Sequence, residues 1–137
     1  LAQAALESGW GPSRLARRGY NSFGLCCFRQ GCGMLPANRD SGANHEVQVF
    51  DSPADSVKAY MLNLNRHPAY ARLRQIRAES RKRNSGVFGC QLALGLDKYS
   101  SRGRAYVQEV QHMIRANRLS RKGAPACKTA APVSNEI

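Results

Sequence analysis

The carboxylate best placed for chemistry in this sequence is Glu7, near the end of an apolar helical stretch. That stretch covers residues 1–6, and Gly9 and Gly11 interrupt it on either side of Trp10, the only tryptophan. A carboxyl group at the end of a buried helix beside Trp10 is expected to be partly desolvated, and desolvation raises a carboxyl pKa. A carboxyl group that keeps its proton near neutral pH can act as the general acid in glycosidic bond cleavage. The alternative is an exposed glutamate without a chemical role.

Cleavage of a glycosidic bond normally needs a second carboxyl group across a cleft. Most other acidic residues have local explanations such as helix capping, which leaves Asp40 and Glu46 in the glycine-containing segment 19–50. Glu46 precedes an alternating stretch that predicts a strand over Val47 to Val49, so the strand can fix its direction. Asp40 lies in a predicted turn, and we therefore rank Glu46 first. An N-acetyl sugar could instead supply its own amide oxygen as nucleophile.

Five motifs along the chain occur in an order and spacing typical of one family. They are the segment 1–16 around Glu7, Asn21-Ser22-Phe23-Gly24-Leu25, Phe50-Asp51-Ser52 followed by residues 56–60, His67-Pro68-Ala69-Tyr70-Ala71, and Leu96-Asp97-Lys98-Tyr99-Ser100 with Tyr106. Over residues 1 to about 119 the chain resembles the bacterial β-N-acetylglucosaminidases of glycoside hydrolase family 73. One departure is Cys26-Cys27, which stands where an aromatic residue and a cysteine would be expected.

The resemblance implies roles for several of these residues. It places Glu7 on the catalytic helix and the second acid about forty residues later, which fits Glu46, and Tyr99 resembles a tyrosine lining the catalytic centre. Trp10 and Phe23 are candidates for stacking on sugar faces, because aromatic rings present flat apolar surfaces. As the sole tryptophan, close to Glu7, Trp10 is better explained as a wall of the acid's pocket. Tyr70 matches a family aromatic position, although its helical spacing fits a core residue equally well.

The predicted elements describe a mainly α (α+β) fold. Helices are expected over residues 1–8, from Pro12 to about Arg18, after the capping pair Ser52-Pro53, from Pro68, over residues 88–96, and after Ser100 or Ser101. Between the second and third lies the small β lobe of residues 19–50. A helical domain over residues 1–119 with an inserted β lobe has the lysozyme-like plan, which the resemblance also implies. Residues 120–137 are predicted to form a flexible tail.

The composition is strongly basic. Among 137 residues, 21 Lys and Arg stand against 9 Asp and Glu, for a net charge of +12. Such a balance favours an anionic partner. No helix-turn-helix, zinc-finger or aromatic strand motif points to specific nucleic acid binding, so we expect peptidoglycan glycan strands and anionic envelope polymers instead. The densest basic run, residues 66–83, fits either a solvated helix face or a binding surface.

The five cysteines indicate an oxidising compartment. Cys27 and Cys32 enclose a short loop that could close as a disulfide, Cys90 could pair with Cys127, and Cys26 would be left over. Neither the cysteines nor the histidines show metal-ligand spacing, so we expect no metal and no cofactor. No apolar run is long enough to span a membrane. The sequence begins inside a helical pattern, so a preceding segment is expected, and the protein is expected to act in the periplasm or after secretion.

The function predicted from these features is hydrolysis of β-1,4 bonds in peptidoglycan, as an endo-β-N-acetylglucosaminidase with Glu7 as general acid. An N-acetylmuramidase or a lytic transglycosylase on the same scaffold is the first alternative, and a lone essential glutamate would favour the transglycosylase. A non-catalytic basic module that binds cell wall or nucleic acid is the second. Sequence does not distinguish inverting, retaining and substrate-assisted routes, and it does not give the oligomeric state.

Overall fold

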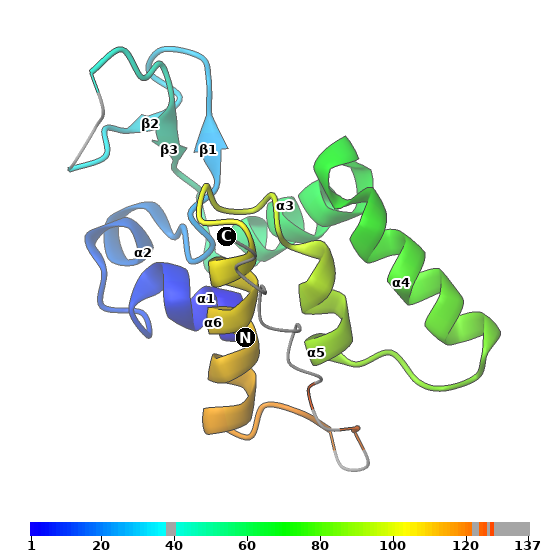
Figure 1. Ribbon diagram of the computed structural model, residues 1–137. Coiled ribbons are helices and arrows are strands. Elements are labelled where there is room, and N and C mark those ends of the chain that lie inside the picture. The colour runs from blue at the N-terminus through cyan, green and yellow to red at the C-terminus, as the bar shows by residue number, and fades with distance from the viewer. Residues whose placement is uncertain (38–40, 122–123, 126, 128–137) are drawn as a thin grey trace, which may run out of the picture. The chain divides into compact units, whose positions relative to one another are not determined.

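The computed structural model describes residues 1–37, 41–121, 124, 125 and 127. Contacts along the chain define two compact units, one of residue 1 with residues 3–65 and one of residue 2 with residues 66–137. Within the described residues there are six α-helices, two 3-10 helices and three short strands (Figure 1). This content confirms the expected mainly α class with a small β lobe.

The first unit begins with two short helices whose ends have local causes. Helix α1 (Ala2–Ser8) ends where Gly9 and Trp10 adopt left-handed conformations, with φ of 59° and 63°; such a reversal is a common helix terminator. Helix α2 (Arg14–Gly19) begins after Ser13, whose hydroxyl accepts a hydrogen bond from the Ala16 amide at 3.2 Å. The second helix therefore starts two residues later than the predicted Pro12.

Helix α3 (Pro53–Arg66) confirms the predicted capping pair. The Ser52 hydroxyl accepts a hydrogen bond from the Asp55 amide at 3.1 Å, and Pro53 is the first helical residue. The helix contributes Tyr60, whose ring stacks on Phe23 with centroids 4.0 Å apart and whose hydroxyl donates to Gln3 Oε1. These contacts place Tyr60 against the core of the first unit.

The β lobe is a three-stranded antiparallel sheet of minimal length. Its strands β1 (Cys26–Cys27), β2 (Gly33–Met34) and β3 (Glu46–Gln48) lie in the order β1-β3-β2. The central strand pairs Val47 with both Cys26 and Met34. The strand predicted from Val47 thus begins one residue earlier, at Glu46.

The second unit consists of helical elements. They are the 3-10 helix η1 (Pro68–Tyr70), α4 (Ala71–Lys82), α5 (Gly89–Leu92), the 3-10 helix η2 (Ala93–Gly95) and α6 (Arg104–Ala116). The helix predicted over residues 88–96 is therefore divided into α5 and η2. The buried amide of Gln111 in α6 donates to the Cys90 carbonyl at 3.0 Å, which joins α6 to α5. Cys90 is also disulfide-bonded to Cys127, as predicted.

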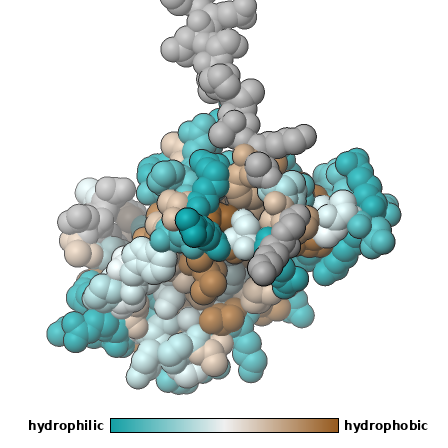
Figure 2. All heavy atoms as spheres, turned by 90° about the horizontal axis from the view of Figure 1, so that it is seen from below, coloured by the Kyte–Doolittle hydropathy of each residue, from teal (hydrophilic) through white to brown (hydrophobic). Residues whose placement is uncertain are grey.

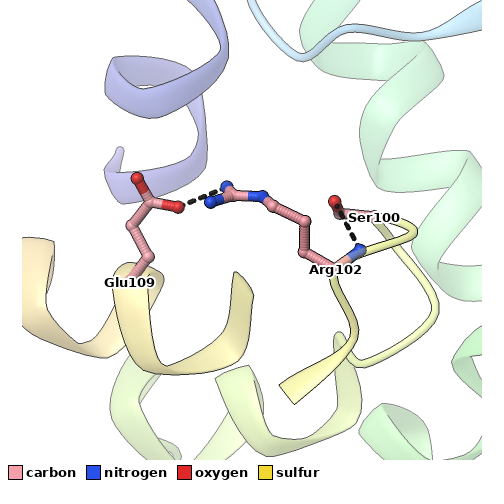
Figure 3. A network of polar contacts seen from close by, with 3 residues as sticks. All are labelled: Ser100, Arg102 and Glu109. Atoms are coloured by element: carbon pink, nitrogen blue, oxygen red, sulfur yellow. Dashed lines mark hydrogen bonds and ion pairs between the residues drawn. The ribbon is translucent and has the colours of Figure 1, made fainter. Parts of the chain in front are cut away.

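The predicted cap of the last helix is wrong. Helix α6 begins after Gly103, which has a φ of 53° and provides no side-chain cap. The Ser100 hydroxyl instead accepts a hydrogen bond from the Arg102 amide at 3.2 Å, in the turn before the helix (Figure 3). Arg102 forms an ion pair with Glu109 and lies over the Tyr106 ring at 5.8 Å. A glycine with positive φ reverses the chain here, and the serines lie outside the helix.

The predicted C-terminal tail and the absence of a membrane-spanning segment were the remaining expectations. The tail predicted over residues 120–137 falls mostly outside the described residues. Among the helices that the structure describes, none combines the length and apolar character needed to cross a membrane.

Gly95→Ala tests the packing of the second unit. A Cβ at Gly95 would lie 2.4 Å from the backbone N and Cα of Leu73, which cannot yield as a flexible side chain would. We expect the free energy of unfolding to fall by about 2 kcal/mol or more, measured by urea denaturation. Gly89→Ala is the control, because among the described residues its Cβ would meet Ile114 Cδ1 alone, at an ordinary 3.6 Å. Equal stability of the two variants would contradict this packing.

Candidate active site

Glu7 lies in the last turn of α1 and is half-buried. Its carboxylate packs against the backbone of Gly24, in the loop between α2 and β1: a Cβ placed on Gly24 would lie 3.1 Å from Glu7 Oε2. Gly24 has a φ of 66°, a conformation that favours glycine. The proposed acid is thus bordered by a loop that approaches closely because one residue has no side chain.

Cys26 is the neighbour of Glu7 on strand β1. It is an exposed cysteine outside the disulfides, and its sulfur lies 3.6 Å from the Gly24 carbonyl oxygen, to which it can donate. Although the side chain reaches solvent, protein atoms partly surround the sulfur. This desolvation, and then the negative charge of Glu7, raise the pKa of the Cys26 thiol. The thiol and the carboxylate therefore share one local environment.

Glu46 occupies a different position from the one expected of a free catalytic base. Its side chain is 9% exposed, and its two carboxylate oxygens accept hydrogen bonds from the amides of Gly31 at 2.9 Å and Gly33 at 2.8 Å. Paired residues of adjacent strands share a face, and successive residues alternate. Because Glu46 pairs with Cys27, it lies on the face opposite to Cys26. In this arrangement Glu46 holds the loop between β1 and β2.

The predicted disulfide between Cys27 and Cys32 closes the same loop, with the Cα atoms 6.2 Å apart. Cys27, Cys32 and Glu46 bring atoms that could ligate a metal within 4.8 Å of one another. Both sulfurs are bonded to each other, however, and both carboxylate oxygens accept amide hydrogens. These contacts make the group a covalent and polar clamp on the loop. Asp40, the other predicted second acid, lies outside the described residues.

The two aromatic residues predicted to bind sugar in the first unit differ in exposure. Trp10 is 62% exposed, so it is not a buried wall of the acid's pocket, and its ring is accessible for stacking. Phe23 is 7% exposed and packs with Leu25, Phe50 and Tyr60. Phe23 is therefore packed in the core, and its stacking on a sugar stays a prediction.

Tyr99 and Tyr70 belong to the second unit. Tyr99 is half-buried, and its ring stacks on the buried ring of Tyr106 with centroids 5.6 Å apart. The buried ring of Tyr70 is tilted against the Tyr99 ring, with centroids 5.9 Å apart. The three tyrosines therefore pack in sequence, with Tyr99 between the other two. The catalytic role of Tyr99 and the substrate contact of Tyr70 stay predictions.

Helix α4 carries the densest positive charge. Figure 2 shows hydrophilic residues covering it, at the right of the view. Four cationic side chains on it or directly after it are exposed, namely Arg72, Arg81, Lys82 and Arg83. Leu73 provides its buried face. The helix therefore packs through few apolar side chains and exposes its cationic side chains to solvent.

Three residues were not predicted as site residues: Gly24 and Cys26, which are neighbours of Glu7, and Asn21, which holds the Gly24 loop by hydrogen bonds. Asn21 and Gly24 belong to the motif Asn21-Ser22-Phe23-Gly24-Leu25, which could have indicated them, whereas the proximity of Cys26 to Glu7 depends on the tertiary structure.

Alkylation of Cys26 measures its proximity to Glu7. Because Glu7 raises the pKa of this thiol, Glu7→Gln should lower it, so the rate of iodoacetamide labelling at pH 8 should rise. Mass spectrometry of the labelled peptide identifies the cysteine, and the pH midpoint of labelling gives the pKa. Asp51→Asn, which removes an exposed carboxylate elsewhere in the unit, should leave the midpoint unchanged. Identical midpoints in Glu7→Gln and the parent protein would contradict the shared environment.

Comparisons with known proteins agree with the motifs. A profile of the glucosaminidase family, described as mannosyl-glycoprotein endo-beta-N-acetylglucosaminidase, matches residues 1–119. The chain is 41% identical over 103 residues to Protein bax of Escherichia coli strain K12, covering 75% of this chain. It spans only 36% of the length of that curated relative. No solved structure matches significantly. The chain belongs to the glucosaminidase family of glycoside hydrolases, as the motif order predicted.

Proposed function

We propose that this domain hydrolyses β-1,4 glycosidic bonds of peptidoglycan as an endo-β-N-acetylglucosaminidase, with Glu7 as the general acid. The observation that carries the proposal is the setting of Glu7: a half-buried carboxyl group at a helix end, packed against Gly24 within the region matched by the family. A positioned carboxyl group of this kind can protonate the leaving oxygen as the glycosidic bond breaks.

The second catalytic group has two candidates. Glu46 is the predicted carboxylate of the β lobe. To activate a water molecule as a base, it would have to keep its hydrogen bonds from the Gly31 and Gly33 amides during the reaction or break them first. The substrate's own N-acetyl oxygen is the other nucleophile, with Tyr99 as the residue proposed to orient it. The clamping contacts of Glu46 favour the substrate-assisted route, and we keep Glu46 as the carboxylate to test against it.

Sugar binding is proposed for Trp10, Phe23 and Tyr70, and the burial of Phe23 and Tyr70 makes Trp10 the best supported of the three. The exposure of Trp10 supports stacking on a pyranose face. Tyr70 has no comparable exposure, and its proposed contact rests on the family motif His67-Pro68-Ala69-Tyr70-Ala71 alone.

The proposed site of action is the periplasm or the cell exterior, where peptidoglycan lies. The two disulfides support an oxidising compartment. The exposed cations of α4 support attraction to anionic envelope polymers, in addition to glycan strands. Muramidase and lytic transglycosylase activity remain the alternatives on this scaffold; mass spectrometry of digested peptidoglycan separates them by the reducing-end sugar or an anhydro product.

Glu7→Gln is expected to reduce hydrolysis of purified peptidoglycan by about 10²–10⁴-fold, because the amide cannot donate the acid's proton. Turbidity clearance measures the rate, and thermal unfolding checks that the variant is folded. A folded variant that clears peptidoglycan at the parent rate would refute the assignment. If neither the parent nor the variant clears peptidoglycan but both bind cell walls in a salt-dependent manner, the domain is a non-catalytic basic module.

Glu46→Gln and Asp40→Asn compare the two carboxylates of the lobe. If Glu46 is a catalytic base, Glu46→Gln should lose activity well beyond its loss of stability, whereas Asp40→Asn should be close to the parent. If Glu46 serves only as a clamp, Glu46→Gln should lower the unfolding temperature while activity well below that temperature is retained. A crippled Asp40→Asn with a normal Glu46→Gln would reverse our ranking.

The basic surface of α4 is tested by the triple variant Arg72→Gln, Arg81→Gln and Arg83→Gln. We expect weaker binding to cell walls that carry anionic polymers and a smaller salt dependence, because exposed charges act through a screened attraction. A pelleting assay measures binding. The control removes three exposed arginines elsewhere in the same unit, Arg115, Arg118 and Arg121. Equal losses in both variants would show that net charge, and not this helix, determines binding.

A further inference from the structure

Asn21 is a fully buried side chain that organises the loop beside Glu7. It is 1% exposed. Its Oδ1 accepts hydrogen bonds from the amides of Phe23 at 3.3 Å and Leu25 at 3.0 Å, and its Nδ2 donates to the carbonyls of Leu25 and Gln48, both at 2.8 Å. All the hydrogen-bonding capacity of the side-chain amide is thus directed to backbone on both sides of Gly24 and to strand β3.

The loop held in this way contacts the proposed acid. Gly24 lies between the two residues whose amides Asn21 binds, and its backbone is the surface on which the Glu7 carboxylate packs. Any side chain at residue 24 would begin 3.1 Å from Glu7 Oε2. That is tighter than an ordinary contact of about 3.5–4.0 Å between nonbonded atoms, so the carboxylate would have to move.

From these contacts we infer that the loop of residues 21–25 is the positioning device for Glu7, in which Gly24 sets the place of the carboxylate and Asn21 fixes Gly24. The inference rests on the proposed role of Glu7 as general acid. Both residues act through Glu7 and need no contact with substrate. A contact of 3.1 Å requires a shift of a few tenths of an ångström. Because misplacing a catalytic group by about 1 Å can cost on the order of 10²-fold in rate, this smaller shift should still lower kcat.

Gly24→Ala is the direct test. The methyl group should displace the Glu7 carboxylate and remove water from it, which favours its protonated form. We expect kcat to fall by about 10-fold or more with KM changed less than about 2-fold, because an interaction of the transition state alone is weakened. The basic limb of the pH profile, where the general acid loses its proton, should move to higher pH.

The matched control is Gly42→Ala. Gly42 also has a positive φ, 88°, but a Cβ there meets no atom of the described residues within 4 Å, so this variant carries the backbone strain without a contact to Glu7. It should lose a similar amount of thermal stability and keep the parent kcat and pH profile. Gly24→Asn is the second variant: asparagine tolerates a positive φ better than alanine, so strain falls while the Cβ contact with Glu7 stays. It should retain the loss in kcat and provides the test if Gly24→Ala does not fold.

The outcomes separate this inference from the proposed function. If Glu7→Gln is inactive while Gly24→Ala and Gly24→Asn match Gly42→Ala in kcat and pH profile, the positioning role is overturned and the general acid stands. If Glu7→Gln works at the parent rate, the proposed function itself fails. A lower kcat with a shifted basic limb in the Gly24 variants alone supports the inference. If neither Gly24 variant folds, Asn21→Asp, which keeps an acceptor but loses both amide donors, must show the kcat loss or the inference falls.

Discussion

The hydrogen bonds of the Asn21 amide are the constraint on which the proposed site depends. A buried amide must satisfy its donors and acceptors within the protein, because leaving one unpaired costs about 1–3 kcal/mol. Asn21 satisfies them with loop backbone and with the Gln48 carbonyl of β3. The surroundings of Glu7 and the strand that carries Glu46 are therefore tied to one side chain, and the loop cannot relax without breaking several hydrogen bonds together.

The β lobe shows why such ties are needed. Strands of two and three residues contribute few ladder hydrogen bonds, and small isolated sheets are marginal in water. The lobe adds a disulfide between Cys27 and Cys32 and a carboxylate, Glu46, that accepts two loop amides. Glu46 is poorly suited to act as a catalytic base, because taking up a proton would neutralise the carboxylate that accepts the two loop hydrogen bonds. A nucleophile supplied by the substrate's N-acetyl group would leave these hydrogen bonds unchanged.

Local rules in the sequence predicted much of the fold. The cap at Ser52-Pro53 and the helix containing Glu7 were visible because capping and apolar spacing are properties of neighbouring residues. The Ser100 cap was wrong, since the conformation of Gly103 decided the start of α6. The contacts of Glu46 with Gly31 and Gly33, and of Glu7 with Gly24, join residues far apart along the chain. The sequence pattern indicated Glu7 and Glu46 as candidate catalytic carboxylates, but the residues that contact them depend on how the loops fold.

The unpaired Cys26 beside the bonded Cys27 has a consequence for oxidative folding. Two adjacent cysteines compete for Cys32, and exchange between the pairings proceeds through attack by a thiolate. The raised pKa of Cys26 lowers the fraction of its sulfur that is thiolate below that of an ordinary cysteine, which slows that attack once the lobe has formed. Strand alternation also directs Cys26 away from the Cys27 side of the sheet. Burial of the sulfur, and to a lesser extent the charge of Glu7, thus disfavour reshuffling of the Cys27–Cys32 pairing.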